Sequence, residues 1–297
     1  MKILIVGGTG LVGATAAVHL RTAGHDVTLM SRHEPTMPPL TEFAHLRHDY
    51  VNDDIAVETL AGFDALVFSA AADIRAVPEG ADMDAFFMHA NTERVPFFIA
   101  QAKAAGIAKT VYIGTFYPQV VPDKIATSAY VRSRHLADEA VRGMADEHFS
   151  VCSLNAPYIL GRFAGVEAPH LVALAQYAAG RLEGLPLVAP KGGVNHISSQ
   201  SMAEAILGAL ENGENGKAYL VGDENLSWKA YLELYCDAAG NPQDLAVSED
   251  EHPMFPDIIL YAGRNATVSY EPENGVLNYR QNRIRETVED ILAAYLD

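Results

Sequence analysis

The chain has 297 residues, of which 49% are hydrophobic and 20% charged, enough for a large buried core. Its 21 basic and 38 acidic residues give a formal net charge of −17, which argues against nucleic acid or anionic membrane surfaces as partners. No apolar run reaches the roughly 18 residues that cross a bilayer, and the two cysteines and scattered histidines lack metal-ligand spacing. We therefore expect a cytoplasmic protein without a metal whose partner is a small molecule.

The first half of the chain alternates apolar, strand-like segments with segments of helical periodicity. Continuous apolar runs predict buried parallel strands, and apolar residues three or four positions apart predict helices. The expected strands are 2–6, 26–30, 46–48, 65–69, 110–113 and 151–154. The expected helices are 11–23, 55–60, 91–105 and 128–147. This alternation predicts an α/β fold with a doubly wound parallel sheet of the Rossmann type.

The second half is less regular, because prolines and glycines cluster between residues 157 and 193. A helix is expected at 201–211, where Ser201 and Glu204 have the spacing of a capping box. The remaining expected elements are a strand at 218–221 and helices at 228–239 and 284–296.

A glycine-rich turn separates the first expected strand from the first expected helix. Gly7, Gly10 and Gly13 form the pattern GxxGxxG. Glycine lets the turn bend sharply, lets backbone N–H groups approach a pyrophosphate, and lets the helix pack tightly on the strand. The phosphates would lie at the helix N-terminus, where free N–H groups and the helix dipole favour an anion. The sequence therefore predicts a nicotinamide dinucleotide site that includes Gly7, Thr9, Gly10, Leu11, Val12 and Gly13.

The end of the second expected strand indicates which dinucleotide binds. An acidic residue there would accept hydrogen bonds from the adenosine ribose, but no carboxylate occurs before Glu34. The chain instead has Ser31 and Arg32, and Arg32 can pair with a 2′-phosphate. The alternative is that Arg32 is a solvated loop cation. The pattern favours NADP(H) over NAD(H).

These features and several later ones resemble the extended short-chain dehydrogenase/reductase family, in its epimerase/dehydratase and hydroxysteroid-dehydrogenase-like branch. The later marks are Asp49 after the third expected strand, small residues at 70–72, Asn91 at a helix start, the segment 128–134, and 196–198 as a strand before a helix. The resemblance covers nearly the whole chain. It implies further dinucleotide contacts by Asp49, Tyr50, Ala70, Ala71, Tyr130, Arg134 and Pro157, with Asn91 as a tether.

In this family a tyrosine, a lysine four residues later and a serine or threonine act together. The resemblance implies that Tyr130 exchanges a proton with the substrate oxygen, and a helix places residue 134 on the same face. Position 134 is arginine, which supplies positive charge and binds ribose hydroxyls but cannot act as a neutral amine. Thr115 is the expected hydroxyl partner, and Tyr117 is the alternative.

We expect residues 1–155 to form a dinucleotide-binding Rossmann domain, to which a strand and a helix at about 194–222 return. Residues 156–297 would form mainly a smaller substrate-binding part, because ligands lie beyond the carboxyl ends of the strands in such sheets. This part is rich in aromatic side chains and shows no arginine pair that would grip a diphosphate. It therefore favours a hydrophobic or aromatic carbonyl substrate.

The first functional hypothesis is NADP(H)-dependent reduction of a carbonyl, or oxidation of the corresponding alcohol, with Tyr130 as the proton-transfer residue. One alternative is a sugar-nucleotide epimerase or dehydratase, and another is a regulatory protein that binds NADP(H) without turnover. The resemblance also implies a possible homodimer.

Overall fold

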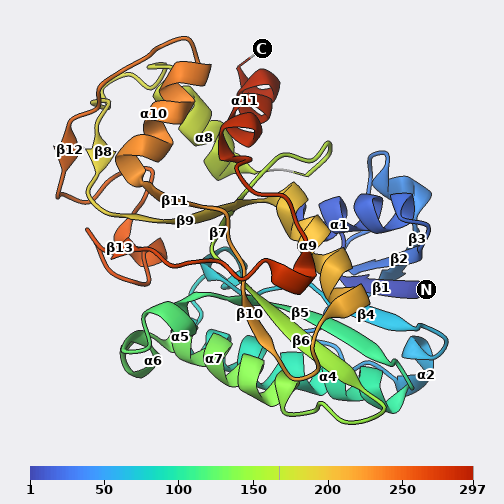
Figure 1. Ribbon diagram of the computed structural model, residues 1–297. Helices are drawn as coiled ribbons and strands as arrows, with labels where there is room; N and C mark the ends of the chain where they lie inside the picture. The colour runs from blue at the N-terminus through green and yellow to red at the C-terminus, as the bar shows by residue number, and fades with distance from the viewer. Residues whose placement is uncertain (167, 297) are drawn as a thin grey trace.

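The computed structural model describes residues 1–166 and 168–296, which form two principal sheets with helices around them (Figure 1). The larger sheet has seven strands in the order β10-β6-β5-β4-β1-β2-β3, and every pair in it is parallel. Its strands are β1 Lys2–Val6, β2 Asp26–Ser31, β3 Ala44–Arg47, β4 Ala65–Phe68, β5 Lys109–Thr115, β6 Ser150–Ala156 and β10 Ala218–Leu220. This confirms the predicted doubly wound, Rossmann-type sheet.

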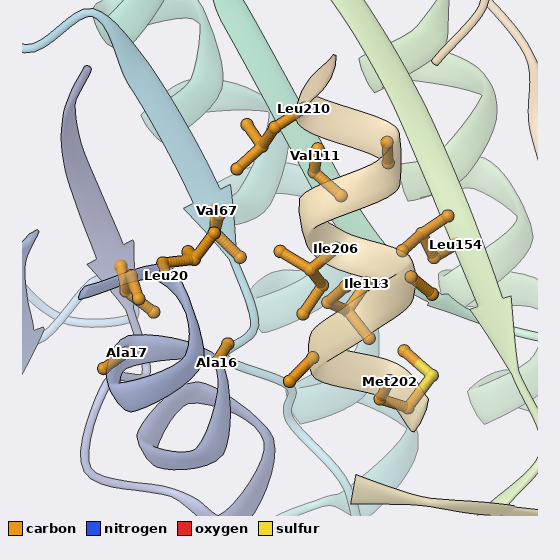
Figure 2. Close-up of a cluster of buried hydrophobic side chains, with 14 of the residues drawn as sticks. Ala16, Ala17, Leu20, Val67, Val111, Ile113, Leu154, Met202, Ile206 and Leu210 are labelled. Atoms are coloured by element: carbon orange, nitrogen blue, oxygen red, sulfur yellow. The ribbon is translucent and has the colours of Figure 1, made fainter. Parts of the chain in front are cut away.

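Helices α1 (Leu11–Thr22) and α9 (Ser199–Asn212) cover one face of this sheet. Side chains alternate between the two faces of a strand, so each buried strand supplies apolar groups to both sides. Figure 2 shows Ile206 of α9 between Val67 and Ile113 of the sheet, with α1 packed alongside. The two helices share one continuous core with the strands beneath them.

Helices α2 (Val57–Leu60), α4 (Val95–Ala104) and α7 (Ala129–Arg142) pack with the opposite face. Here Phe68 of β4 meets Phe98 of α4 edge-on, with 5.5 Å between ring centroids. Helix α7 ends before the expected residue 147, because the chain turns after Arg142 toward β6. Helices cover both faces of the large sheet, so its central strands consist almost entirely of apolar residues. This pattern allows the sequence to predict them.

The second part of the chain contains a four-stranded sheet and three longer helices. Its strands are β7 Tyr158–Leu160, β9 Gly193–Ser198, β11 Glu224–Ser227 and β13 Thr267–Val268, and β8 Ala189–Pro190 pairs separately with β12 Val247–Ser248. Its longer helices are α8 Pro169–Ala178, α10 Trp228–Ala238 and α11 Ile284–Tyr295. The segment at about 194–222 divides between the two sheets. Helix α9 packs on the large sheet, and β10 is one of its strands. Strand β9, expected there, instead pairs with β7, β11 and β13.

Short elements complete the fold. They are η1 Leu40–Glu42, η2 Ile74–Ala76, α5 Tyr117–Val120, α6 Lys124–Thr127, η4 Asp257–Ile259 and η5 Gly275–Leu277. Within the described residues, no helix combines the length and the apolar character that a bilayer crossing requires.

The helix around Asn91 differs from the expectation, because Asn91 does not begin it. Helix α3 (Met83–Phe87) starts earlier, where the Asp82 carboxylate accepts a hydrogen bond of 3.0 Å from the backbone N–H of Ala85. The chain then continues through a π-helical segment, η3 (Met88–Arg94), into α4. Asn91 therefore lies inside a widened helical turn, a feature that often marks functional sites.

The start of α9 also differs from the expectation. Ser198, not Ser201, caps the helix, since its hydroxyl accepts a hydrogen bond of 2.9 Å from the backbone N–H of Ser201. Glu204 does not reach back to the cap but pairs with Arg280 at 2.7 Å. The predicted capping box is therefore wrong, and the helix begins two residues earlier, at Ser199.

Candidate active site

A cleft of about 1080 Å³ lies where the carboxyl ends of the parallel strands meet the second sheet. The glycine turn and Arg32 line one side, which we call the dinucleotide end. Tyr130, Tyr158, His170 and Tyr261 line the other side, which we call the aromatic end. The cleft therefore occupies the position that Rossmann-type sheets use for ligands.

The glycine turn is shaped for close backbone approach. Gly7 has a φ of +82°, and a Cβ on it would lie 2.7 Å from the backbone nitrogen of Ala70. A Cβ on Gly13 would overlap the carbonyl oxygen of Gly7, so α1 packs tightly on β1 only without a side chain there. Gly10 caps α1 without a side-chain hydrogen bond, and the first turn holds no acidic residue. The helix N-terminus thus presents free N–H groups, which fit a pyrophosphate.

Arg32 follows β2, is exposed at the cleft, and forms no ion pair with any described residue. The Ser31 hydroxyl beside it donates to the carbonyl oxygen of His33 at 2.7 Å. Asp49 accepts hydrogen bonds from the Val51 backbone at 3.0 Å and the Asn52 side chain at 2.9 Å. Although burial acts to raise it, these bonds hold the pKa of Asp49 below its usual value. The Asp49 carboxylate thus stabilises its own turn beside the cleft.

Tyr130 stands in the first turn of α7, which the Ser128 hydroxyl caps by accepting from the Val131 backbone at 3.3 Å. Its ring stacks on Tyr261 with 4.0 Å between centroids and meets Phe87 edge-on at 5.4 Å. These contacts fix the orientation of the phenol in the wall of the cleft.

Thr115, at the end of β5, lines the same cleft as Tyr130. Burial raises the pKa of Tyr130, whereas the charge of Arg134 acts to lower it. Tyr117, the alternative hydroxyl, packs its ring on Phe116 at 4.2 Å between centroids. The structure thus brings together the three residues that the sequence singled out.

Arg134 is buried, with 2% of its surface exposed, and lines the cleft beneath Tyr130. Its Nη2 donates to the carbonyl oxygen of Ile113 at 2.6 Å, and the guanidinium lies 5.4 Å from the centroid of the Tyr112 ring. Its Nε and Nη1 have no hydrogen-bond partner among the described residues. Buried donors normally find acceptors, so these nitrogens fit the ribose hydroxyls of a bound dinucleotide.

The small residues after β4 and Pro157 after β6 also line the cleft. Ala70 makes the close approach to Gly7 described above, and Ala71 lies next to it. Asn91 is fully buried, and its Nδ2 lies 3.2 Å from both the carbonyl oxygen of Ala72 and the hydroxyl of Ser133. Asn91 therefore ties the segment after β4 to helix α7.

Three cleft residues carry no signal in the sequence. Asp73 caps the turn η2 after β4, which contains Arg75, and the Asp73 carboxylate accepts from Nε of Arg75 at 3.1 Å and from Nη2 at 2.5 Å. His170 lines the same end of the cleft, where burial first and the Arg75 charge second lower its pKa to about 4. No motif marks these residues, because they meet only once separate loops converge.

Comparison with known proteins relates this geometry to a family. The model of the NAD dependent epimerase/dehydratase family matches residues 3–222. A UDP-glucose 4-epimerase from Corynebacterium glutamicum is 27% identical over an alignment of 273 residues that covers 82% of each chain.

Two solved structures share the fold over almost their whole length. The crystal structure of gox2253 has a TM-score of 0.80 and 19% identity, covering 99% of this chain and 97% of that one. The UDP-glucose 4-epimerase of Bifidobacterium longum, solved with NAD+ and UDP, has a TM-score of 0.73 and 15% identity, covering 98% and 97%. With the cleft, the glycine turn and the family match in agreement, this chain belongs to the NAD dependent epimerase/dehydratase family.

Proposed function

We propose that the protein is an NADP(H)-dependent oxidoreductase that interconverts a carbonyl and an alcohol on a substrate with a hydrophobic or aromatic body. The observation that carries the proposal is that Tyr130, Thr115 and the buried Arg134 line one cleft together with the glycine turn. Such a group combines a proton donor, an orienting hydroxyl and a fixed cation within reach of one reacting centre.

When bound, the dinucleotide would supply or accept a hydride at its nicotinamide ring. In the reductive direction Tyr130 donates its proton to the carbonyl oxygen, and the Thr115 hydroxyl orients the same oxygen. Burial keeps Tyr130 protonated beforehand, and the charge of Arg134 stabilises the tyrosinate that remains. The free Nε and Nη1 of Arg134 would hold the ribose hydroxyls.

The preference for NADP(H) rests on Arg32. Its guanidinium is exposed at the dinucleotide end and unpaired within the described chain, so it is available for a 2′-phosphate. The nearby Asp49 carboxylate already accepts two hydrogen bonds from its own turn, which favours this role for Arg32 over a ribose contact by Asp49.

Sugar-nucleotide epimerisation is the second candidate, and the family match together with the UDP-glucose 4-epimerase relative favours it. In that reaction the same tyrosine would remove and return the proton of a sugar hydroxyl. At the aromatic end of the cleft, Arg75 is the only lysine or arginine among the described residues of the lining, so few cations are available for a diphosphate.

The test is a comparison of the wild type with Tyr130→Phe, using NADPH and NADH fluorescence and then panels of aromatic ketones and UDP-sugars. We expect the wild type to oxidise NADPH with a ketone, and Tyr130→Phe to lose turnover while keeping its NADPH affinity. Tyr295→Phe, in the last turn of α11, is the matched control.

Three results would contradict the proposal. Retained turnover in Tyr130→Phe would remove Tyr130 from its role. Conversion of a UDP-sugar without net NADPH consumption would favour the epimerase. Tight NADPH binding without any turnover would favour a regulatory protein.

A further inference from the structure

The aromatic end of the cleft contains a cation whose role is not explained by the dinucleotide. Arg75 lines the cleft, and 74% of its side-chain surface is exposed. The same end of the cleft is lined by Tyr130, Tyr158 and His170. The charge of Arg75 acts on the pKa of all three, which agrees with this proximity. Arg75 therefore lies at the solvent-accessible border of the cleft that contains the proposed proton donor.

Arg75 is held in a defined orientation. The Asp73 carboxylate accepts from the Arg75 backbone N–H at 2.9 Å, and it also binds the Nε and Nη2 of the guanidinium. Only one edge of the planar guanidinium is used in this way. Nη1 has no acceptor among the described residues, so the edge formed by Nη1 and Nη2 is available to a ligand. A free guanidinium edge matches the two oxygens of a carboxylate.

The distribution of charge along the cleft limits what this edge can bind. Among the described residues, the lysines and arginines that line the cleft are Arg32, Arg75 and Arg134. Arg32 belongs to the dinucleotide end, and Arg134 lies buried beneath Tyr130. Arg75 is thus the single such cation at the aromatic end, and the Asp73 carboxylate offsets part of its charge, so this end suits one anionic group on an apolar body better than a diphosphate.

We propose that Arg75, positioned by Asp73, binds a carboxylate of the substrate, so that the substrate is an oxo acid or hydroxy acid with an aromatic or apolar body. This inference rests on the proposed function, because it places the carboxylate beside the carbon that reacts at Tyr130. The aromatic rings of Tyr158 and Tyr261 would enclose the rest of the molecule.

The test compares each aromatic oxo acid with its methyl ester, using NADPH oxidation by the wild type and by Arg75→Gln. A bidentate, charge-assisted pair is worth about a 10- to 100-fold difference in kcat/KM, so the wild type should prefer the acid by about that factor. In Arg75→Gln the acid-to-ester ratio should fall to near 1, mainly through KM for the acid. Arg75→Lys keeps the charge but loses the fork, so its ratio should be intermediate.

Arg280→Gln is the matched control, because Arg280 also binds a carboxylate through Nε and Nη2 and is 65% exposed, but lies outside the cleft lining. It should keep the wild-type ratio. A wild type that prefers the ester, or an Arg75→Gln variant that keeps the preference for the acid, would overturn the inference. NADPH affinity of each variant shows whether it is folded.

A second measurement is independent of turnover. Calorimetric titration of the NADPH complex with phenylacetate and with phenylacetamide should show tighter binding of the carboxylate, and Arg75→Gln should lose this difference. Carboxylate selectivity without turnover of any compound would leave the inference standing while the proposed function fails. Turnover of neutral ketones without carboxylate selectivity in either assay would overturn the inference and leave the proposed function standing.

Discussion

A buried arginine one helical turn after a reactive tyrosine changes what the pair can do with protons. A lysine at position 134 would titrate, whereas the guanidinium of Arg134 stays charged at every working pH. Its hydrogen bond to the Ile113 carbonyl and its place over Tyr112 also anchor it more rigidly than a flexible ammonium would be. Arg134 therefore acts as a fixed positive charge, and Tyr130 is the group whose protonation state changes during the reaction.

The pH dependence of the reaction should reflect this arrangement. Burial raises the pKa of Tyr130 above its usual 10.0, so the protonated form needed for reduction persists through neutral and mildly alkaline solution. We expect kcat/KM for reduction to stay level from about pH 6 to 9, and kcat/KM for alcohol oxidation to rise with pH over that range. Initial rates in both directions test this. A fall in reduction between pH 6 and 8 would point to another proton donor.

Arg32 provides a second prediction at this scale. Replacing it with alanine removes a cation at the dinucleotide end that pairs with no described residue, so NADPH affinity should fall by about 10- to 100-fold and NADH affinity should change much less. Fluorescence titration of both dinucleotides measures the two effects in parallel. Equal losses for NADPH and NADH would remove the basis for preferring NADP(H).

At the scale of elements, the glycine turn joins β1 to α1 so closely that its backbone becomes part of the binding surface. The same turn also sets the distance between the helix and the strand, because Gly13 leaves no room for a side chain beside Gly7. Binding and packing therefore depend on the same few atoms.

Gly13→Ala should consequently damage both properties. The new Cβ would overlap the carbonyl oxygen of Gly7 and lie 2.8 Å from the hydroxyl oxygen of Ser69, so α1 must move away from β1. We expect loss of dinucleotide binding and a lower Tm. Gly275→Ala is the control, since its Cβ would meet no atom within 4 Å. A Gly13→Ala protein with wild-type affinity would contradict this view of the turn.

The elements that could be predicted are those whose burial leaves a simple pattern. The central strands of the large sheet, such as β1 and β4, are apolar on both faces, and α1 and α10 carry regular apolar spacing. Strands β7, β11 and β13 have two to four residues each and lie in the less regular second half of the chain, where strands and helices do not alternate. Helix α8 was not predicted because it begins at Pro169, within the run of prolines and glycines that suggested loops.

The site residues likewise include some that the local sequence predicts and some that it does not. The positions of Tyr130 and Arg134 follow from one helix, and those of Gly7 to Gly13 from one turn, so local spacing was sufficient for them. The role of Arg75 depends on a loop after β4 meeting residues from the second part of the chain. A contact between segments so far apart in the chain produces no recognisable local sequence pattern.

At the scale of the whole molecule, the second part contains a fully buried histidine. His196 of β9 packs against Tyr231, with 4.4 Å between ring centroids, and against Trp228 and Tyr158. Burial lowers the pKa of His196 to about 3 from its usual 6.5. The folded protein therefore holds this ring neutral where an unfolded chain would protonate it.

Stability should fall as the solution becomes acidic. Between about pH 6.5 and 3 the unfolded chain binds a proton at residue 196 that the folded protein does not, so acid favours unfolding by up to about 1.4 kcal/mol per pH unit. Urea unfolding at pH 7 and pH 5 measures the slope. His196→Gln should reduce this slope, whatever it does to stability at pH 7. An unchanged slope would mean that other groups dominate acid unfolding.

The large sheet is completed by β10, which pairs with β6 only after the chain has passed through the second part. Helix α9, which covers one face of the sheet, is itself synthesised after β9, and its Gly208 packs against the backbone of Leu277. During translation the first 155 residues would emerge with an open strand edge and a bare apolar face. The strand edge and this face therefore stay uncovered until the chain has been made through Leu220, 65 residues further on, which leaves them open to aggregation in the meantime.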